Sequence, residues 1–141
     1  MTVTELVNRI PVVEIHGDSN REVSELVFDS RKVSENSLYI AMRGTVVDGH
    51  TFIASSIEKG ATTIVCEEFP GTLAENVTYV KVKDSAKTLG QLASNFYGNP
   101  SQKLKLIGVT GTNGKTTTTS LLYQLFRKSG HKVGLISTIA I

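Results

Sequence analysis

The sequence predicts a mixed α/β protein: a small α/β domain, followed by the beginning of a parallel-sheet domain of the P-loop ATPase type. Short apolar runs alternate with segments of helical periodicity through the first 100 residues. The turn-forming group Gly98-Asn99-Pro100-Ser101 then marks a boundary. Beyond it come a strand, a glycine-rich turn, a helix and a further strand, the length that a right-handed parallel crossover needs.

Four strands and three helices are expected in the first domain. The strands are predicted at residues 23–28, 38–41, 62–66 and 78–82, and the helices at 2–9, 51–59 and 85–97. Gly60 can take the left-handed conformation that ends the second helix, and Gly98 can end the third. Asp84 is the expected N-cap of the third helix.

The second domain is expected to be incomplete in this sequence. Its predicted elements are a strand at 104–109, a helix at 115–129 and a strand at 133–139. Two strands and one helix cannot cover both faces of a parallel sheet. We therefore expect residues 1–100 to form one domain and residues 101–141 to be the start of another, within a longer natural protein.

Composition narrows the class of protein and its partners. With 40% hydrophobic and 20% charged residues the chain is typical of a soluble globular protein. A net charge of +2 with scattered Lys and Arg favours neither a nucleic-acid nor a membrane partner. The N-terminus has no signal-peptide pattern, so the cytoplasm is the expected location. The single cysteine, Cys66, lies in an apolar run and is expected to be a buried thiol.

The strongest functional signal is the segment from Gly108 to Thr116, which reads GVTGTNGKT. Glycines after a strand let backbone N–H groups point at an anion, and the following helix offers its N-terminus. Lys115 can neutralise the β- and γ-phosphates of a nucleotide, and the Thr116 hydroxyl can bind its Mg²⁺. A glycine-rich turn without a ligand is the alternative, which the ordered glycines, lysine and threonine disfavour. The common pattern has glycine where this chain has Val109, so the loop is a variant form.

Two loops of the first domain are weaker candidates. Asp29-Ser30-Arg31 follows a strand and places a hydroxyl beside a guanidinium, which suits an anionic ligand. A plain turn, with Asp29 capping and Arg31 in solvent, is the favoured interpretation from the residues alone. The glycine-marked segment 44–50 can likewise be an ordinary loop. His16 and His50 lack the spacing of metal ligands, and His131 is expected to be exposed.

Together these segments resemble the Mur ligase family. The resemblance rests on Asp29-Ser30-Arg31, Leu38 to Ala41 with Gly44, Asp48 to Phe52, Gly60-Ala61, Phe96-Tyr97 with Pro100, and Gly108 to Thr117. The variant phosphate loop is this family's own form. That loop alone is also similar to the loop of folylpolyglutamate synthase, from which the motifs of the first domain separate it.

The resemblance implies an ATP-dependent amide-bond ligase of peptidoglycan precursor synthesis. A family member of this kind adds the third amino acid, diaminopimelate or lysine, to UDP-N-acetylmuramoyl-L-alanyl-D-glutamate through an acyl phosphate. The cofactors implied are ATP and Mg²⁺, the partners are small-molecule substrates, and a monomer is expected. The sequence itself does not distinguish diaminopimelate from lysine.

The resemblance also assigns residues to these roles. The residues implied to bind the UDP moiety are Phe28, Ser30, Thr45, Val46 and Val47. Those implied to bind ATP are Gly111, Thr112, Asn113, Gly114, Lys115, Thr116 and Thr117. Among the latter, Lys115 is the catalytic residue and Thr116 the metal ligand.

Two alternatives remain open from the sequence. One is the related ligase that adds D-alanyl-D-alanine, whose first domain carries similar motifs. The other is a binding module that takes up a UDP-sugar or ATP without chemistry. Under the ligase interpretation, residues 1–141 alone are expected to have no ligase activity, because other catalytic parts of the family lie further along the chain.

Overall fold

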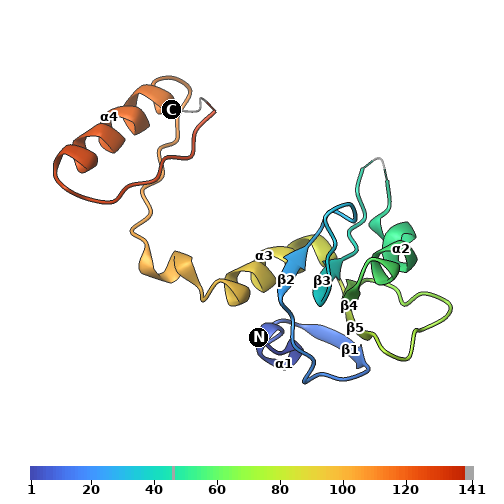
Figure 1. Cartoon of the computed structure of the whole chain (residues 1–141). Coiled ribbons are helices and arrows are strands. Elements are labelled where there is room, and N and C mark those ends of the chain that lie inside the picture. Colours follow the sequence, from blue (N-terminus) through green and yellow to red (C-terminus); the bar gives the residue numbers. More distant parts are fainter. Residues whose placement is uncertain (46, 139–141) are drawn as a thin grey trace. The chain divides into compact units, whose positions relative to one another are not determined.

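A computed structural model of the chain describes residues 1–45 and 47–138 (Figure 1). The chain divides into two compact units, Met1–Lys103 and Leu104–Ile141. The predicted boundary after residue 100 falls within η2 (Pro100–Lys103), a short 3-10 helix at the end of the first unit. No helix in the described part of the chain is both long enough and apolar enough to cross a membrane.

The first unit is built on a sheet with strand order β1-β5-β4-β3-β2. The strands are β1 (Val12–His16), β2 (Glu25–Val27), β3 (Ser37–Ile40), β4 (Ala61–Cys66) and β5 (Thr78–Val82). Strands β2, β3, β4 and β5 run parallel to one another, whereas β1 pairs antiparallel with β5. The carboxyl ends of the four parallel strands therefore meet at one edge of the sheet.

Helices lie on both faces of this sheet. The short α1 (Val3–Leu6) and the longer α3 (Ser85–Phe96) share one apolar cluster with Leu38 and Ile40. On the other face, α2 (Ile53–Glu58) packs through Ile53 into a cluster with Tyr39 and Ile64. Successive strand residues point to opposite faces, so the four consecutive buried residues of β3 supply both clusters. The run Leu38 to Ala41 is apolar for this reason.

Local signals place the ends of α3 close to their predicted positions, whereas the helix predicted at 51–59 is divided between a 3-10 helix, η1 (Gly49–Phe52), and α2. The Asp84 carboxylate accepts a hydrogen bond of 2.9 Å from the backbone N–H of Lys87 and so caps α3. Gly98 follows α3 with a φ of 72°. Gly60 follows α2 with a φ of 105°, a conformation in which a side chain would be strained. The predicted strands at 23–28, 38–41, 62–66 and 78–82 correspond to β2, β3, β4 and β5.

The N-terminal segment differs from the prediction. The helix expected at 2–9 is only the one-turn α1, which begins with a capping box between Thr2 and Glu5. Arg9 has a φ of 63°, which cannot continue a helix, and Pro11 follows. Strand β1 was not predicted, because most of its residues are exposed and pairing with β5 stabilises it rather than a buried face.

The second unit contains α4 (Lys115–Lys128), which confirms the helix predicted at 115–129, and Gly130 follows with a φ of 84°. The two strands predicted beside it are wrong for the described residues: 104–109 and 133–138 are not in strands, and Ile139 lies outside the described part. Leu106 is 92% exposed and Ile136 is 99% exposed. A parallel pair is stable only where other elements cover its faces. In the part of this unit that the structure describes, α4 is the single other element.

Candidate functional site

The carboxyl edge of the parallel strands in the first unit carries the first candidate site. Open α/β sheets bind ligands at this edge. The segment after β2 holds Phe28 and Ser30, and the segment after β3 holds Thr45 and Val47. Val46, also implied by the resemblance, lies outside the described residues. The structure thus brings both predicted segments to the same edge of one sheet.

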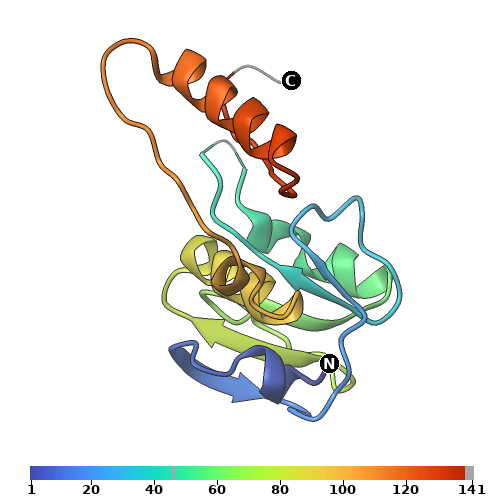
Figure 2. The same ribbon diagram turned by 90° about the vertical axis from the view of Figure 1, so that its left-hand side faces the viewer.

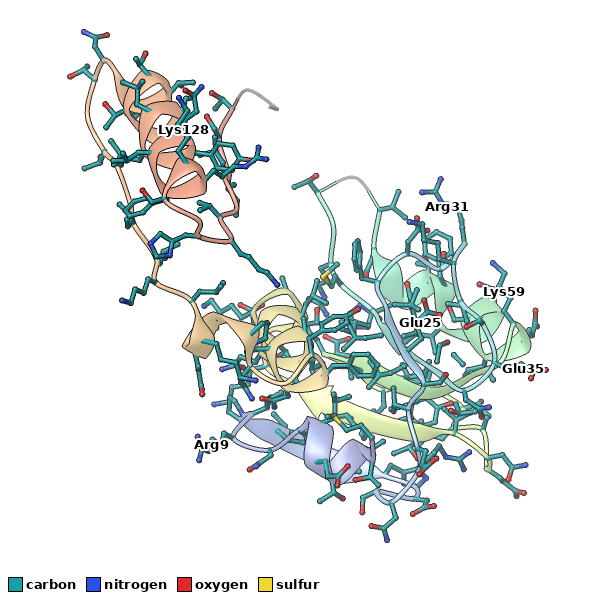
Figure 3. The ribbon with its side chains drawn as sticks, turned by 60° about the vertical axis from the view of Figure 1, so that its left-hand side comes forward. Arg9, Glu25, Arg31, Glu35, Lys59 and Lys128 are labelled. Carbon is teal, nitrogen blue, oxygen red and sulfur yellow. The ribbon has the colours of Figure 1, made fainter. Side chains whose placement is uncertain are left out.

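The turn at Asp29-Ser30-Arg31 is closed by an ion pair. The Asp29 carboxylate accepts hydrogen bonds from the Arg31 backbone N–H at 3.1 Å, from its Nε at 2.9 Å and from its guanidinium at 2.8 Å. These bonds, the side-chain ones first, lower the pKa of Asp29 to about 2. Arg31 is otherwise exposed (Figure 3). The turn expected from the residues is confirmed, and its arginine is engaged by Asp29.

A second contact holds the same turn from α2. The Lys59 ammonium donates a hydrogen bond of 2.9 Å to the backbone carbonyl of Ser30, which leaves the Ser30 hydroxyl for other partners. Lys59 and Arg31 lie on the same side of the first unit in Figure 3. Phe28 is exposed next to this turn. An exposed aromatic ring next to a hydroxyl, on a residue whose backbone is held in place by Lys59, is suited to a planar polar ligand such as a nucleobase.

The segment after β3 forms a narrow loop. The Gly44 N–H donates to the Val47 carbonyl at 3.1 Å, and Arg43 and Asp48 form an antiparallel bridge at the base. Figure 2 shows this loop, in teal, rising from the end of β3. Thr45 and Val47 are exposed on it. The loop therefore presents side chains at the sheet edge from a closed base.

His50 fixes the base of this loop, a role that its sequence did not reveal. Its Nδ1 lies 2.7 Å from the Asp48 carboxylate, and its Nε2 accepts a hydrogen bond of 2.9 Å from the backbone N–H of Glu67. Nε2 is therefore unprotonated, and Nδ1 carries the proton donated to Asp48. The His50 backbone N–H, and then its ring, lower the pKa of Asp48. Asp two residues before His is a local signal, but Glu67 is 17 residues away.

Glu67 extends the connection to α3. Its carboxylate accepts hydrogen bonds of 3.0 Å from both the N–H and the hydroxyl of Ser85, in the first turn of α3. It also lies 3.3 Å from the Nε of Arg43, whose guanidinium binds Glu68 at 2.7 Å. The ends of β3 and β4 and the start of α3 are thus held by one polar network, defined here as Arg43, Asp48, His50, Glu67 and Ser85.

The second candidate site is the glycine loop before α4. Gly111 has a φ of 147° and Gly114 a φ of 76°, conformations that favour glycine. Gly114 is the N-cap of α4 and offers no side chain to the first helical N–H groups. Those N–H groups have no acceptor within the helix and carry its positive dipole end. The loop therefore presents an anion-binding helix start.

Lys115 supplies the positive charge of this loop. Its ammonium donates hydrogen bonds to the carbonyls of Gly111 and Thr112, the second at 3.3 Å, so it lies over the loop. The side chains of Thr112, Asn113 and Thr117 are exposed, and Thr116 is partly buried. The predicted loop residues are brought together at the start of one helix.

The loop fits the groups that its sequence implies. It offers N–H donors, an ammonium and hydroxyls, and residues 108–117 contain no carboxylate that would repel a phosphate. A triphosphate would be held by the Gly111–Lys115 backbone and Lys115, and Mg²⁺ by the hydroxyl of Thr116.

Comparison with known proteins shows the family to which the chain belongs. Residues 22–97 match the profile described as "Mur ligase family, catalytic domain", and residues 109–141 match the "Mur ligase middle domain". The first profile spans more than half of the chain. The chain belongs to the Mur ligase family. The profile of the middle domain covers most of the phosphate loop.

Individual Mur ligases give the level of similarity. The chain is 52% identical over 139 residues to a protein from Phocaeicola vulgatus named UDP-N-acetylmuramoyl-L-alanyl-D-glutamate--2,6-diaminopimelate ligase. That match covers 99% of this chain and 29% of the relative, so the chain spans under a third of the length of this Mur ligase.

Solved Mur ligase structures share the fold. A UDP-N-acetylmuramoylalanyl-D-glutamyl-2,6-diaminopimelate--D-alanyl-D-alanyl ligase from Acinetobacter baumannii is 25% identical, with a TM-score of 0.68, over 91% of this chain and 28% of that one. A MurF ligase from Thermotoga maritima, solved in complex with ADP, is 33% identical with a TM-score of 0.55, over 74% of this chain and 23% of that one. The α/β fold class predicted from the sequence is confirmed.

Proposed function

We propose that this chain carries the UDP-binding and ATP-binding segments of a ligase that joins 2,6-diaminopimelate to UDP-N-acetylmuramoyl-L-alanyl-D-glutamate. The observation that carries the proposal is the helix-capping loop Gly111–Lys115, in a chain 52% identical to a relative of that name. The D-alanyl-D-alanine alternative is less favoured, since several relatives that are 52% or 53% identical over nearly the whole chain carry the diaminopimelate-ligase name.

Two transfers make up the proposed reaction. The γ-phosphoryl group of ATP passes to the terminal carboxylate of the UDP-linked dipeptide, and ADP leaves. The amino group of diaminopimelate then attacks the acyl phosphate, the C–N bond forms, inorganic phosphate leaves, and the amine loses a proton. Such phosphoryl transfer depends on positioning and on neutralising charge.

The residues of the phosphate loop contribute charge and position. The Lys115 ammonium, which now binds loop carbonyls, would turn to the β- and γ-phosphate oxygens and neutralise them. The N–H groups at the start of α4 would hold the phosphates through the helix dipole. The hydroxyl of Thr116 would hold Mg²⁺, which would supply positive charge against the phosphates when bound.

The first unit would hold the UDP moiety at the carboxyl edge of its sheet. Phe28 would pack against the uracil ring, and the hydroxyl of Ser30 would donate to a polar atom of the nucleotide. Thr45, Val46 and Val47, on the loop after β3, would line the other side. We further propose that the whole protein acts as a cytoplasmic monomer on these small-molecule substrates.

Calorimetric titration of the chain with ATP and Mg²⁺ tests the phosphate loop. Lys115→Ala is expected to weaken binding at least about tenfold, the loss typical of one charged partner. Lys128→Ala, at the other end of α4, is the matched control and is expected to bind as the unchanged chain does. Equal binding by Lys115→Ala and the control would remove Lys115 from the site.

Titration with UDP tests the first unit. Ser30→Ala is expected to weaken UDP binding, and Ser101→Ala, which replaces an exposed serine in η2, is the control.

A parallel assay for amide formation from ATP, diaminopimelate and the UDP-dipeptide is expected to show no product with residues 1–141 alone. Binding of neither nucleotide, or product formation by this chain, would contradict the proposal.

A further inference from the structure

His50 is a largely buried polar side chain at the carboxyl edge of the sheet, and the proposed function leaves it unused. Its side chain is 15% exposed, and each ring nitrogen has a partner. Nδ1 meets the Asp48 carboxylate at 2.7 Å, and Nε2 accepts the Glu67 backbone N–H at 2.9 Å. The ring thus links the base of the loop after β3 to the end of β4.

We infer that His50, with Asp48, is a positioning residue for nucleotide binding: it fixes the loop that carries Thr45 and Val47 at the UDP-binding edge. The inference rests on the proposed UDP site. The ring itself points into the network rather than to the exposed face of the loop, so it is assigned no contact with the nucleotide.

The packing around Gly49 supports this assignment. A Cβ at Gly49 would lie 2.7 Å from the carbonyl oxygen of Met42 and 2.8 Å from its nitrogen, so the two segments touch through backbone. The Gly49 N–H donates to the Met42 carbonyl at 2.7 Å, and the Gly49 carbonyl accepts from the Tyr39 hydroxyl at 3.0 Å. The segment that bears His50 is therefore hydrogen-bonded to Tyr39 in β3 and to Met42 just after it, so this segment and the end of β3 are expected to move together.

The opposite side of the ring is equally well anchored. Glu67 directly follows β4, and its carboxylate holds the first turn of α3 through Ser85. Arg43, at the base of the loop, lies 3.3 Å from the same carboxylate. His50 and Arg43 thus attach the loop to β4 by two independent contacts, of which only that of His50 reaches backbone. Removing the ring is expected to leave the exposed Arg43 side chain as the link described here between the loop and the residues that follow β4.

An ordered loop binds a ligand more tightly because less conformational entropy is lost on binding. Calorimetric titration of the 141-residue chain with UDP tests the inference. The titration is carried out at a temperature well below the unfolding midpoints of all variants. His50→Ala is expected to weaken UDP binding about tenfold, the effect of losing a single well-made hydrogen bond to a binding loop. His50→Gln, which retains an acceptor for the Glu67 N–H, is expected to recover part of that loss. His16→Ala, an exposed histidine in β1, is the matched control and is expected to bind as the unchanged chain does.

Amide hydrogen exchange supplies the second measurement. In His50→Ala the N–H groups of Gly44 and Glu67 are expected to exchange faster, while those in the centre of β4 keep their protection.

Unchanged UDP affinity in a folded His50→Ala chain would overturn the inference and leave the proposed function intact. Failure of the unchanged chain to bind UDP would overturn the proposed function, and the inference with it. A loss of affinity that His50→Gln does not reverse at all would also contradict it.

Discussion

Gly49 lies against Met42 so closely that the Gly49 N–H donates to the Met42 carbonyl oxygen at 2.7 Å. A side-chain carbon at Gly49 would meet that same oxygen at 2.7 Å, well inside van der Waals contact. Replacing Gly49 by alanine must therefore separate the segment 48–50 from the end of β3.

Gly49→Ala is expected to lower the free energy of unfolding of the first unit by about 1–3 kcal/mol, the usual cost of forcing an extra carbon into a packed site. Urea denaturation followed by circular dichroism measures the change. Gly90→Ala is the control: it lies inside α3, nothing lies within 4 Å of its added carbon, and it is expected to raise stability by about 0.5–1 kcal/mol. Equal stability of the two variants would show that the close approach at Gly49 is absent in solution.

The Asp29–Arg31 ion pair predicts a titration. The folded pKa of Asp29 is about 2, below its ordinary value of 3.8, because Arg31 donates to it. The pair's contribution to stability is therefore complete above pH 3.8 and is lost as the pH falls through about 2. Arg31→Gln is expected to raise the pKa of Asp29 toward 3.8, measured from its carboxyl carbon chemical shift. Arg9→Gln, remote from this turn, is the control; an unchanged Asp29 pKa in Arg31→Gln would contradict the pairing.

Sequence-based prediction succeeded where the stabilising contacts are local. Asp84 caps α3 by accepting from the N–H of Lys87, three residues further along, and Gly98 follows the end of the helix. The bounds predicted for α3 were therefore nearly correct. The apolar run Leu38 to Ala41 indicated a buried strand directly. The phosphate loop was likewise predicted from local pattern, since Gly111, Gly114 and Lys115 lie within five positions of the sequence.

The features that were missed depend on distant partners. Strand β1 exists because His16 pairs with Tyr79, and nothing near His16 signals that pairing. The role of His50 depends on Glu67, 17 residues further along. The strands predicted at 104–109 and at 133–138, the described part of the second prediction, are absent for the same reason. Apolar residues such as Leu106 form a strand only beside neighbours that the described part of this unit does not supply. Local pattern thus predicted the site residues, while the network that holds them required the fold.

Cys66 gives a clean probe of the sheet, as it is the chain's single cysteine. Burial raises the pKa of its thiol to about 12, from an ordinary value of 9.0. The thiolate is the reactive form, so the folded chain is expected to react with iodoacetamide at pH 8 far more slowly than the same chain in urea. Because the unfolded chain ionises first, the free energy of unfolding is also expected to fall as the pH rises above 9.0. Equal reaction rates in buffer and urea would contradict burial of Cys66.

Gly114 joins the phosphate loop to α4 as the N-cap residue of that helix, with a φ of 76° and no side-chain cap. An alanine there costs roughly 1 kcal/mol in the left-handed conformation, although nothing lies within 4 Å of the added carbon. Gly114→Ala is therefore expected to shift the first turn of α4 away from helix, which amide and Cα chemical shifts of Lys115 to Thr117 report. It is also expected to weaken ATP binding by up to about tenfold, because the N–H groups lose their common direction. Gly134→Ala, with open space around it and no positive φ, is the control. A Gly114→Ala chain with unchanged shifts and unchanged ATP affinity would show that the left-handed residue does not set the direction of the loop.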